Sequence, residues 1–454
     1  MRILHVIHDF LPRHRAGSEI YADTLAHALV ERGHEVHILC AEYDPQRPHL
    51  SLNWRWHEGL PITEITNNWI FPRFEESYCS NAINEQLEHV LKAVAPDILH
   101  IHNLLNLSFD LPQIAKRLGI PSVATLHEYV LLCPSGGQRV HLSEEYVCTE
   151  IDFDRCTRCF TQSHFYSQMA FAHLGGGQPG FISRLAAIAK NIAPALFTKI
   201  GRATTARLPG VPITVHDIEK RMQAANEVFD AIELFVAPSP SLSEEFRRFG
   251  MPEDKIEVSD YGFETLNHAE KVPSTDRLRI GFAGTLIWRK GAHILVEAVR
   301  RLPAESVEVL IFGNLETFPG YVHDLRASAE GLPIHFMGGF DGENAAEVYA
   351  QMDVLVIASL WPENSPLVIH EAFMAGLPVI GSNMGGTRDL IDDGRSGLLY
   401  EAFSPESLSN CLQRMLDEDE LLENFRAHLP PVKSITDDAE KWERIYELVV
   451  MGPE

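Results

Sequence analysis

The chain has 454 residues, of which 45% are apolar and 22% charged, a composition typical of a globular protein long enough for two domains. The formal net charge of −25 argues against nucleic acid as a partner. No apolar run approaches the roughly 20 residues that cross a bilayer, and the N-terminus "MRILHVIH" opens directly on a strand pattern. We therefore expect a cytoplasmic protein.

The first half of the chain alternates buried strands with amphipathic helices. Residues 3–8 ("ILHVIH") and 34–41 ("HEVHILCA") have the pattern of strands, and the helix expected at 20–33 joins them into a βαβ unit. Further strands are expected at 96–103 ("PDILHIHN") and 121–129 ("PSVATLHEY"). Their polar residues follow the apolar run, at the edge where open α/β sheets bind ligands.

A second series of alternating elements begins after a polar stretch, so we place a domain boundary near residues 262–277. The expected strands are 278–286, 307–313, 334–340, 353–359 and 377–382, with helices at 292–302 and 343–352. The pattern predicts an N-terminal Rossmann-like domain at 1–265 with an insertion at about 133–235, a second such domain at 276–430, and a helix at 431–454 that packs back on the first domain. Neither domain has a G-x-G-x-x-G fingerprint between strand and helix, which disfavours a nicotinamide or flavin dinucleotide.

The stretch "WPENSPLVIHEAFMAGLPVIGSNMGG" (361–386) places two glutamates eight positions apart on an apolar helix. Pro366 suits the first helical position and Ser365 the N-cap, which puts Glu363 ahead of the helix and Glu371 inside it. The free amides of residues 365–368 and the helix dipole would favour a diphosphate. A carboxylate that accepts hydrogen bonds from vicinal hydroxyls would suit a ribose, so a nucleotide sugar fits the pattern. Two solvated surface charges are the alternative, because such spacings are common by chance.

Residues 363–400, "ENSPLVIHEAFMAGLPVIGSNMGGTRDLIDDGRSGLLY", closely resemble the signature of the retaining GT-B glycosyltransferases of family 4. Further matches are "GSEIYADTLAHALVERGHEV", "TLHEY", "GFAGTLIWRKGAHILVEAV" and "VYAQMDVLVIAS". The resemblance implies two Rossmann-like parallel-sheet domains that face a central cleft. It also implies transfer of a sugar from a nucleotide-diphosphate donor to a glycan or lipid-linked acceptor, in cell-surface polysaccharide or glycoconjugate synthesis, without a bound divalent metal.

The same resemblance implies roles for individual residues. Glu371 would bind the donor ribose, Glu363 the donor sugar, and Lys290 the leaving diphosphate, whose developing charge needs a cation in the transition state. His127 would line the reaction centre, although a lone histidine near an apolar strand is otherwise most often a core residue. The remaining expected donor contacts are Gly17, Ser18, Arg289, Asn364, Ser365, Pro366, Leu367 and Val368, and the double glycine Gly385–Gly386 would let backbone approach the ligand.

Three positions depart from the family pattern. Many relatives have an arginine where this chain has Thr285, so Arg289 is the nearby substitute for a second cation on the diphosphate. Asp389 replaces a usual glutamate after the double glycine, and Glu128 replaces a frequent aspartate after His127. The first departure puts the stabilisation of the leaving group in doubt, and the other two are mild.

Four cysteines form a cluster in the sequence, Cys133, Cys148, Cys156 and Cys159. They supply the ligand count of a tetrahedral structural zinc site, although only the last two have the usual close spacing. Free or redox-active thiols are the main alternative, with disulfides or an iron–sulfur centre behind them. A zinc here would pin the loop after His127 and would be structural.

The segment 155–216 contains no aspartate or glutamate, in a chain with 63 acidic residues. It includes "FISRLAAIAKNIAPALFTKIGR", whose basic residues are Arg184, Lys190, Lys199 and Arg202. Such a segment could lie on an anionic membrane at its inner face or grip a lipid-linked diphosphate acceptor. A pair of helices packed on the first sheet is the alternative.

Two further functions remain open at this point. A nucleotide-sugar epimerase on the same fold would interconvert its donor without an acceptor, and it should not need the arrangement of Glu363 and Glu371. A non-catalytic sugar-nucleotide-binding subunit is the other, for which Thr285 is the one hint. Fold alone does not separate these functions, whereas the site residues favour transfer.

Overall fold

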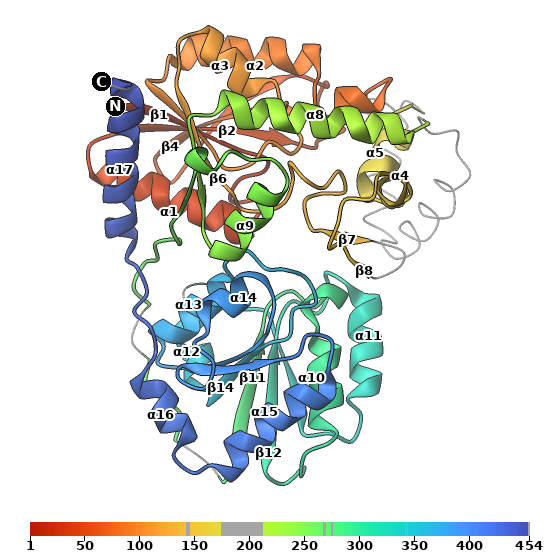
Figure 1. Ribbon diagram of the computed structural model, residues 1–454, viewed down its shortest axis with the longest axis vertical. Helices are drawn as coiled ribbons and strands as arrows, with labels where there is room; N and C mark the ends of the chain where they lie inside the picture. Colours follow the sequence, from red (N-terminus) through yellow and green to blue (C-terminus); the bar gives the residue numbers. More distant parts are fainter. Residues whose placement is uncertain are drawn as a thin grey trace. The chain divides into compact units, whose positions relative to one another are not determined.

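The computed structural model describes residues 1–141, 146–173, 212–266, 269–273, 276–340, 342 and 344–452. The chain divides into two compact units (Figure 1). The first unit comprises Met1–Ala237, Ser243–Ser259 and Thr436–Glu454, and the second comprises Pro238–Leu242 and Asp260–Ile435. Arg184, Lys190, Lys199 and Arg202, on which the expected membrane contact rests, lie outside the described residues.

The first unit is built on a mostly parallel sheet, which has eight strands within the described residues, in the order β10-β9-β6-β5-β1-β2-β4-β3. Only β3 runs antiparallel to its neighbour. The strands are β1 (Arg2–Ile7), β2 (Glu35–Glu42), β3 (Leu52–His57), β4 (Leu60–Thr66), β5 (Ile98–Ile101), β6 (Ser122–Thr125), β9 (Leu234–Ala237) and β10 (Ile256–Val258). The predicted strands of the βαβ unit are confirmed as β1 and β2, whereas β3, β4, β9 and β10 were not predicted from the sequence.

Helices cover both faces of this sheet (Figure 1). They are α1 (Gly17–Glu31), α2 (Asn81–Val94), α3 (Leu111–Arg117), α8 (Val215–Ala231), α9 (Pro240–Arg248) and α17 (Ile435–Met451), with short 3₁₀ turns η1 (Phe74–Ser77) and η3 (Glu253–Lys255). A side module holds the hairpin β7 (Val140–His141) and β8 (Tyr146–Val147) with α4 (Phe153–Thr161) and α5 (His164–Phe171).

The C-terminal helix α17 returns to the first unit and packs against α1 (Figure 1). The Tyr21 hydroxyl donates to Asp438 Oδ2 at 2.7 Å, and Trp442 Nε1 donates to the Tyr21 hydroxyl at 3.0 Å. Trp442 and Tyr446 are almost completely buried. Because aromatic side chains remove so much apolar area from water, α17 is part of the first unit's core.

The second unit contains a parallel sheet of six strands among the described residues, in the order β13-β12-β11-β14-β15-β16. The strands are β11 (Leu278–Ala283), β12 (Val307–Phe312), β13 (Ile334–Gly338), β14 (Val354–Ile357), β15 (Val379–Ser382) and β16 (Gly397–Tyr400). The helices are η4 (Trp288–Lys290), α10 (Ala292–Val299), α11 (Pro319–Ser328), α12 (Ala345–Ala350), α13 (Leu367–Met374), α14 (Gly385–Leu390), α15 (Pro405–Asp417) and α16 (Leu421–Ala427).

Two apolar clusters lie on the two faces of the second sheet. One joins Ile280 and Val309 to α10 and α15, and the other joins Leu310 and Leu355 to α12 and α13. Alternate residues of a strand point to opposite faces, so the apolar run at 309–312 ("VLIF") serves both clusters. None of the described helices combines the length and the apolarity needed to cross a bilayer.

Candidate functional site

The loop between β14 and α13 carries Glu363, one of the two glutamates singled out in the sequence. Its side chain is 7% exposed, and Glu363 Oε1 pairs with Lys290 Nζ at 2.6 Å and accepts a hydrogen bond from Ser359 Oγ at 2.6 Å. Lys290 ends the turn η4 after β11, and its ammonium lies 5.8 Å from the centre of the Trp361 ring. The structure thus brings together a carboxylate and a cation that are 73 positions apart in the chain.

Glu371 lies inside α13 and is held by a residue that the sequence analysis did not assign. The Tyr349 hydroxyl on α12 donates to Glu371 Oε2 at 2.6 Å. Burial raises the pKa of Glu371 above its usual value, while the hydrogen bond from Tyr349 and the nearby His370 act in the opposite direction. Tyr349 therefore keeps one carboxylate oxygen occupied and favours the charged form.

The expected start of α13 is wrong by one residue. The helix begins at Leu367, and Pro366 occupies the N-cap with φ −65° and ψ 117°, which is extended backbone. Ser365 does not cap the helix, because its hydroxyl donates to Asp260 Oδ1 at 2.7 Å instead. The amides that begin the helix are those of Leu367 and Val368, and such N–H groups at a helix start favour an anion.

Asp260, the first residue of the longer segment of the second unit, ties this loop to the helix. Its second oxygen, Oδ2, bonds His370 Nε2 at 2.7 Å, and the His370 ring stacks on Phe263 with centroids 4.4 Å apart. Burial opposes ionisation of Asp260, but the bonds from His370 and Ser365 outweigh it and lower its pKa below the usual value. Asp260 thus holds the 363–367 loop by a charged contact.

The double glycine at the start of α14 packs against the same loop. A Cβ on Gly386 would lie 1.8 Å from the Asn364 carbonyl oxygen, and one on Gly385, whose φ is +53°, would lie 2.7 Å from the Glu363 carbonyl oxygen. The Gly386 amide donates to that Glu363 oxygen at 2.7 Å. The close approach that these glycines permit is therefore to the backbone that presents Glu363.

Two of the residues that depart from the family pattern, Thr285 and Asp389, lie in the second unit. Thr285 is exposed in the loop between β11 and η4, and Arg289 and Lys290 lie in η4 itself. Asp389 on α14 accepts hydrogen bonds from the amide and hydroxyl of Ser241, at 2.7 and 2.8 Å. The acidic side chain at position 389 thus has a hydrogen-bond partner in Ser241, one of the first residues of α9. These first residues belong to the second unit, whereas α9 from Ser243 onward belongs to the first.

The first unit places Gly17 and Ser18 at the start of α1. The Glu19 side chain, 3% exposed, accepts bonds from the Ala16 amide at 3.1 Å and from the Ser18 hydroxyl at 3.2 Å. His8 Nε2 lies 3.3 Å from the other Glu19 oxygen. A buried carboxylate therefore stabilises the helix start and takes the Ser18 hydroxyl into its own network.

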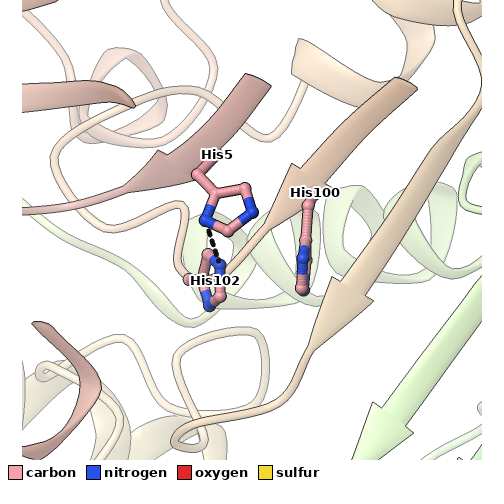
Figure 2. Close-up of side chains that lie close together, drawn as sticks. All are labelled: His5, His100 and His102. Atoms are coloured by element: carbon pink, nitrogen blue, oxygen red, sulfur yellow. Dashed lines mark hydrogen bonds between the residues drawn. The ribbon is translucent and has the colours of Figure 1, made fainter. Parts of the chain in front are cut away.

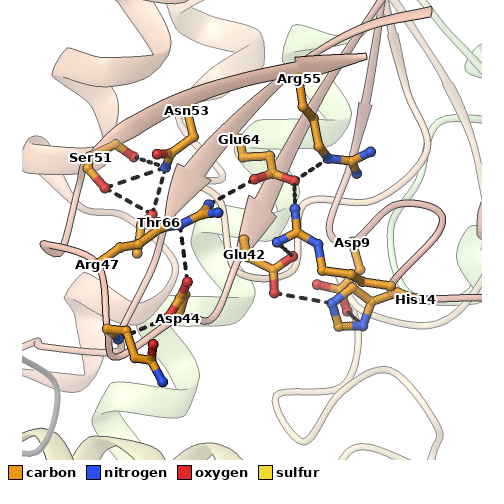
Figure 3. A network of polar contacts seen from close by, with 12 residues as sticks. Asp9, His14, Glu42, Asp44, Arg47, Ser51, Asn53, Arg55, Glu64 and Thr66 are labelled. Carbon is orange, nitrogen blue, oxygen red and sulfur yellow. Dashed lines mark hydrogen bonds and ion pairs between the residues drawn. The ribbon is translucent and has the colours of Figure 1, made fainter. Parts of the chain in front are cut away.

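A polar network anchors the loop that leads to Gly17 (Figure 3). Glu64 on β4 is 1% exposed and pairs with Arg13 of that loop, with Arg47 at 3.1 Å and with Arg55 at 2.5 Å. Glu42, at the end of β2, pairs with Arg13 at 3.4 Å. The network joins the loop to the carboxyl ends of β2 and β4, so it is best explained as structural support.

His127 follows β6 and is 8% exposed, in a cluster of buried histidines. Its Nε2 lies 3.0 Å from His102 Nδ1, and His102 Nε2 lies 3.2 Å from His5 Nδ1. Burial lowers the pKa of His127 to about 3, with a smaller contribution from His8, so the ring is neutral at physiological pH. A cavity of about 30 Å³ borders His102 and His127.

His5, His100 and His102 have nitrogens within 4.8 Å of one another, close enough to share a metal ion (Figure 2). Both nitrogens of His100 are already hydrogen-bonded, to the Tyr446 hydroxyl at 2.7 Å and to Thr125 Oγ1 at 2.8 Å. Both nitrogens of His102 are also engaged. A hydrogen-bonded core cluster explains these side chains better than a metal site does.

The four cysteines of the expected zinc site gather in the side module. Burial, together with a smaller contribution from Cys133 and Cys159, raises the pKa of the Cys148 thiol to about 11. Cys156 is affected in the same way by burial and then by the other three thiols. Among the described residues, however, no group of three or more potential ligands within 4.8 Å of one another includes a cysteine. The expected zinc site is therefore not supported.

Several residues of these sites were not predicted from the sequence. Tyr349 stands in "VYAQMDVLVIAS", a stretch that matched the family pattern without showing what its tyrosine contacts. His102 had a usable signal, since "ILHIH" puts His100 and His102 on one face of a strand. A wider hollow of about 840 Å³ in the second unit, lined by residues such as Glu308 and His335, includes none of the expected site residues in its lining.

Known proteins resemble this chain in both halves. The family described as Glycosyltransferase Family 4 matches residues 15–176, and the one described as Glycosyl transferases group 1 matches residues 277–418. The putative glycosyltransferase YtcC of Bacillus subtilis is 28% identical over 198 residues, which are 40% of this chain and 48% of that protein. The D-inositol 3-phosphate glycosyltransferase of Corynebacterium kroppenstedtii is 32% identical over 150 residues, 31% of this chain and 33% of that protein. The chain thus spans half or less of the length of these two relatives.

Solved structures match over almost the whole chain. Anabaena HepE, crystallised in complex with UDP and glucose, has a TM-score of 0.62 at 15% identity, covering 98% of this chain and 99% of that one. Sucrose-phosphate synthase from Thermosynechococcus elongatus has a TM-score of 0.63 at 16% identity, covering 98% of both chains. At these identities the match shows a shared fold, in which two parallel α/β sheet domains are followed by a C-terminal helix that contacts the first helix.

Proposed function

Because this chain belongs to family 4 of the GT-B glycosyltransferases, we propose that it transfers a sugar from a nucleoside-diphosphate sugar to an acceptor hydroxyl with retention of configuration. The acceptor we propose is a glycan or a lipid-linked sugar, in the synthesis of a cell-surface polysaccharide or glycoconjugate. The enzyme would act in the cytoplasm, in contact with the inner face of the membrane through residues 155–216.

One observation carries the proposal. Lys290 and Ser359 converge on Glu363, and Glu371 lies in α13, the helix that follows this loop and whose first amides favour an anion. A cation for a diphosphate, a carboxylate for sugar hydroxyls and a second carboxylate for a ribose are thus held within one loop–helix segment and its neighbours. This set of groups matches the chemical parts of a nucleotide sugar.

In the proposed reaction, the bond between the anomeric carbon and the diphosphate oxygen breaks, and a bond to the acceptor oxygen forms on the same face. The departing phosphate takes the acceptor's proton. Charge develops on the diphosphate as the bond breaks, and Lys290 with the Leu367 and Val368 amides would stabilise it. Because Lys290 is paired with Glu363, the donor would compete with Glu363 for this cation.

The first unit would contribute His127 beside the donor sugar and the Gly17–Ser18 turn beside the phosphates, as the family pattern implies. Arg289 would supply the second cation that Thr285 does not. Asn364, Ser365 and Pro366 would shape the phosphate loop. Family members generally require no metal for transfer, so we propose none for this chain.

The test is donor binding by the Glu371→Ala variant. The variant loses hydrogen bonds from ribose hydroxyls to a carboxylate, so its donor Kd should rise by roughly 100-fold, given about 1.5–3 kcal/mol for each charged bond. Isothermal titration with a panel that begins with UDP-sugars measures this, after thermal-shift screening has identified the donor. Glu330→Ala, on the surface of the same unit, is the matched control and should bind as the wild type does.

Assays of nucleotide release separate the possible activities. A transferase releases nucleoside diphosphate faster when a suitable acceptor is added. Interconversion of the sugar nucleotide without an acceptor would identify an epimerase, and donor binding without any turnover would identify a binding subunit. Normal binding and turnover by Glu371→Ala would overturn the roles given to these residues.

A further inference from the structure

Three buried imidazoles form a continuous hydrogen-bonded line that ends at His127. The line runs from His5 Nδ1 to His102 Nε2 at 3.2 Å, and from His102 Nδ1 to His127 Nε2 at 3.0 Å. Figure 2 shows the bond between His5 and His102, with the His100 ring beside them. His102 therefore uses both of its nitrogens on other histidines.

The sheet places these rings on one face. In the register of β1 and β5, His5 is opposite His100, and His102 follows His100 by two residues, so all three side chains point to the same side. His127 stands two residues beyond the end of the next strand, β6. Three neighbouring parallel strands thus supply a row of rings at the carboxyl end of the sheet.

All three rings of the line are neutral at physiological pH. Burial lowers the pKa of His5 to about 3 and that of His127 to about 3, and it places the pKa of His102 well below the usual value. A neutral imidazole has one N–H donor and one acceptor nitrogen. His102 must therefore donate to one neighbour and accept from the other, so both hydrogen bonds point in the same direction along the line.

Neighbouring aromatic groups hold His102 in place. His100 stacks on His102 with ring centroids 4.1 Å apart and an interplanar angle of 26°. His100 is itself fixed by its bonds to Tyr446 and Thr125 and by Trp442, whose ring centroid is 4.1 Å away. A ring flip of His102 would exchange carbon for nitrogen at both of its bonds, so the packing and the bonding favour one orientation.

We propose that His102 is a positioning residue that determines which ring nitrogen of His127 carries the proton, and that His5 sets this choice through His102. The proposal rests on the proposed function only in placing His127 beside the donor sugar. A neutral histidine with one defined tautomer offers a sugar hydroxyl either a donor or an acceptor, not a mixture of both. The line of rings would thus prepare His127 before the donor arrives.

The experiment measures the tautomer of His127 directly. Full-length protein labelled with ¹⁵N-histidine is studied by two-bond ¹H–¹⁵N correlation between about pH 5 and 8, where an ordinary histidine titrates. In the wild type, His127 should be neutral throughout and in one tautomer. In His102→Phe, it should become a mixture of the two tautomers or begin to titrate.

His5→Phe is the decisive variant, because it leaves the bond between His102 and His127 in place. If His5 acts through His102, His127 should again become a mixture of the two tautomers or begin to titrate in this variant, although the substitution does not contact His127. His37→Phe removes a half-buried histidine elsewhere in the sheet, one bonded to Thr63 at 2.9 Å, and should leave the His127 signals unchanged. His102→Gln, whose amide can donate and accept, is studied if His102→Phe does not fold and should retain one tautomer.

Kinetics supply the functional readout. His102→Phe should lower kcat by about 10- to 100-fold, because a misdirected group costs most in the transition state, with little change in donor KM. Two results would overturn the proposal that His5 and His102 determine the His127 tautomer. One is a mixture of His127 tautomers in the wild type, and the other is a single, unchanged His127 tautomer in His5→Phe. Failure of the proposed function would appear separately, as a wild type that turns over no donor while the tautomer signals follow the prediction.

Discussion

Two carboxylates only eight positions apart in the chain have different electrostatic surroundings. Glu363 is buried and pairs with a cation, whereas Glu371 is half-buried and lies beside Tyr349 and His370. Burial raises the pKa of Glu371, and the Tyr349 hydrogen bond limits the rise. The charged form that a ribose would need thus depends on one hydroxyl group from a neighbouring helix.

Tyr349→Phe should make donor binding more sensitive to acid. Without the hydroxyl, the pKa of Glu371 rises further, so the carboxylate is protonated at a higher pH and the acid limb of donor affinity moves to higher pH. At alkaline pH the affinity should be close to that of the wild type. Calorimetric titration of the donor across the pH range measures the shift.

Tyr321→Phe is the matched control for this prediction. It removes another buried hydroxyl of the second unit, one bonded to His293 at 2.9 Å and away from Glu371. Its pH profile should follow that of the wild type. If Tyr349→Phe gave the same profile as Tyr321→Phe, Tyr349 would not control the ionisation of Glu371.

At the scale of elements, the loop between β14 and α13 is held from two sides. Asp260 bonds Ser365 and His370, and the start of α14 packs its double glycine against the backbone of residues 363–364. This loop presents the groups proposed to bind the donor. Its conformation is therefore set by elements that come from outside the E-x7-E stretch itself.

Gly386→Ala should destabilise the second unit and weaken donor binding. The new Cβ would lie 1.8 Å from the Asn364 carbonyl oxygen, a backbone atom that no side-chain rotation can move away. We expect a loss of about 3 kcal/mol in the free energy of unfolding, at the upper end of the cost of overpacking. Urea unfolding followed by fluorescence, together with donor titration, measures both effects.

Gly320→Ala in α11 is the control, because a Cβ there meets no atom within 4 Å. That substitution should leave stability unchanged or raise it by up to about 1 kcal/mol, since alanine favours helix over glycine. Equal stability of Gly386→Ala and Gly320→Ala would show that the loop between β14 and α13 can move to accommodate the new side chain on α14.

At the scale of the whole molecule, the dominant property is the net charge of −25. A folded chain concentrates this charge, so self-repulsion destabilises the compact state. Added salt screens exposed charges at distances of about 10 Å or more, while close buried pairs such as Glu64 with Arg47 and Arg55 are screened much less. Repulsion should therefore respond to salt more than the internal ion pairs do.

Raising sodium chloride from about 0.05 to 0.3 M should increase the midpoint of thermal unfolding by about 2 °C or more. Differential scanning fluorimetry at constant pH measures the shift. The same series in potassium chloride should give the same shift, because screening depends on ionic strength and not on the cation. A midpoint that falls with salt would mean that surface ion pairs contribute more to stability than repulsion removes.

The sequence by itself determined the fold class, strands β1, β2, β5 and β6 of the first sheet, strands β11 to β15 of the second, and the glutamates of the E-x7-E stretch. These features are local, because periodicity, helix signals and motif spacing are properties of neighbouring residues. The one-residue error at α13 arose because Ser365 could bond its own helix or Asp260, 105 positions away, and local rules describe only the first choice.

Only the tertiary structure decided which distant groups meet. Lys290 and Glu363, Tyr349 and Glu371, and the line from His5 through His102 to His127 are contacts between separate elements of the fold. The structure also shows no group of three mutually close thiols among the described cysteines, although their spacing in the sequence had suggested one. The physical reason is that sheet register and helix packing bring these side chains together, and neither is encoded in the spacing of any single motif.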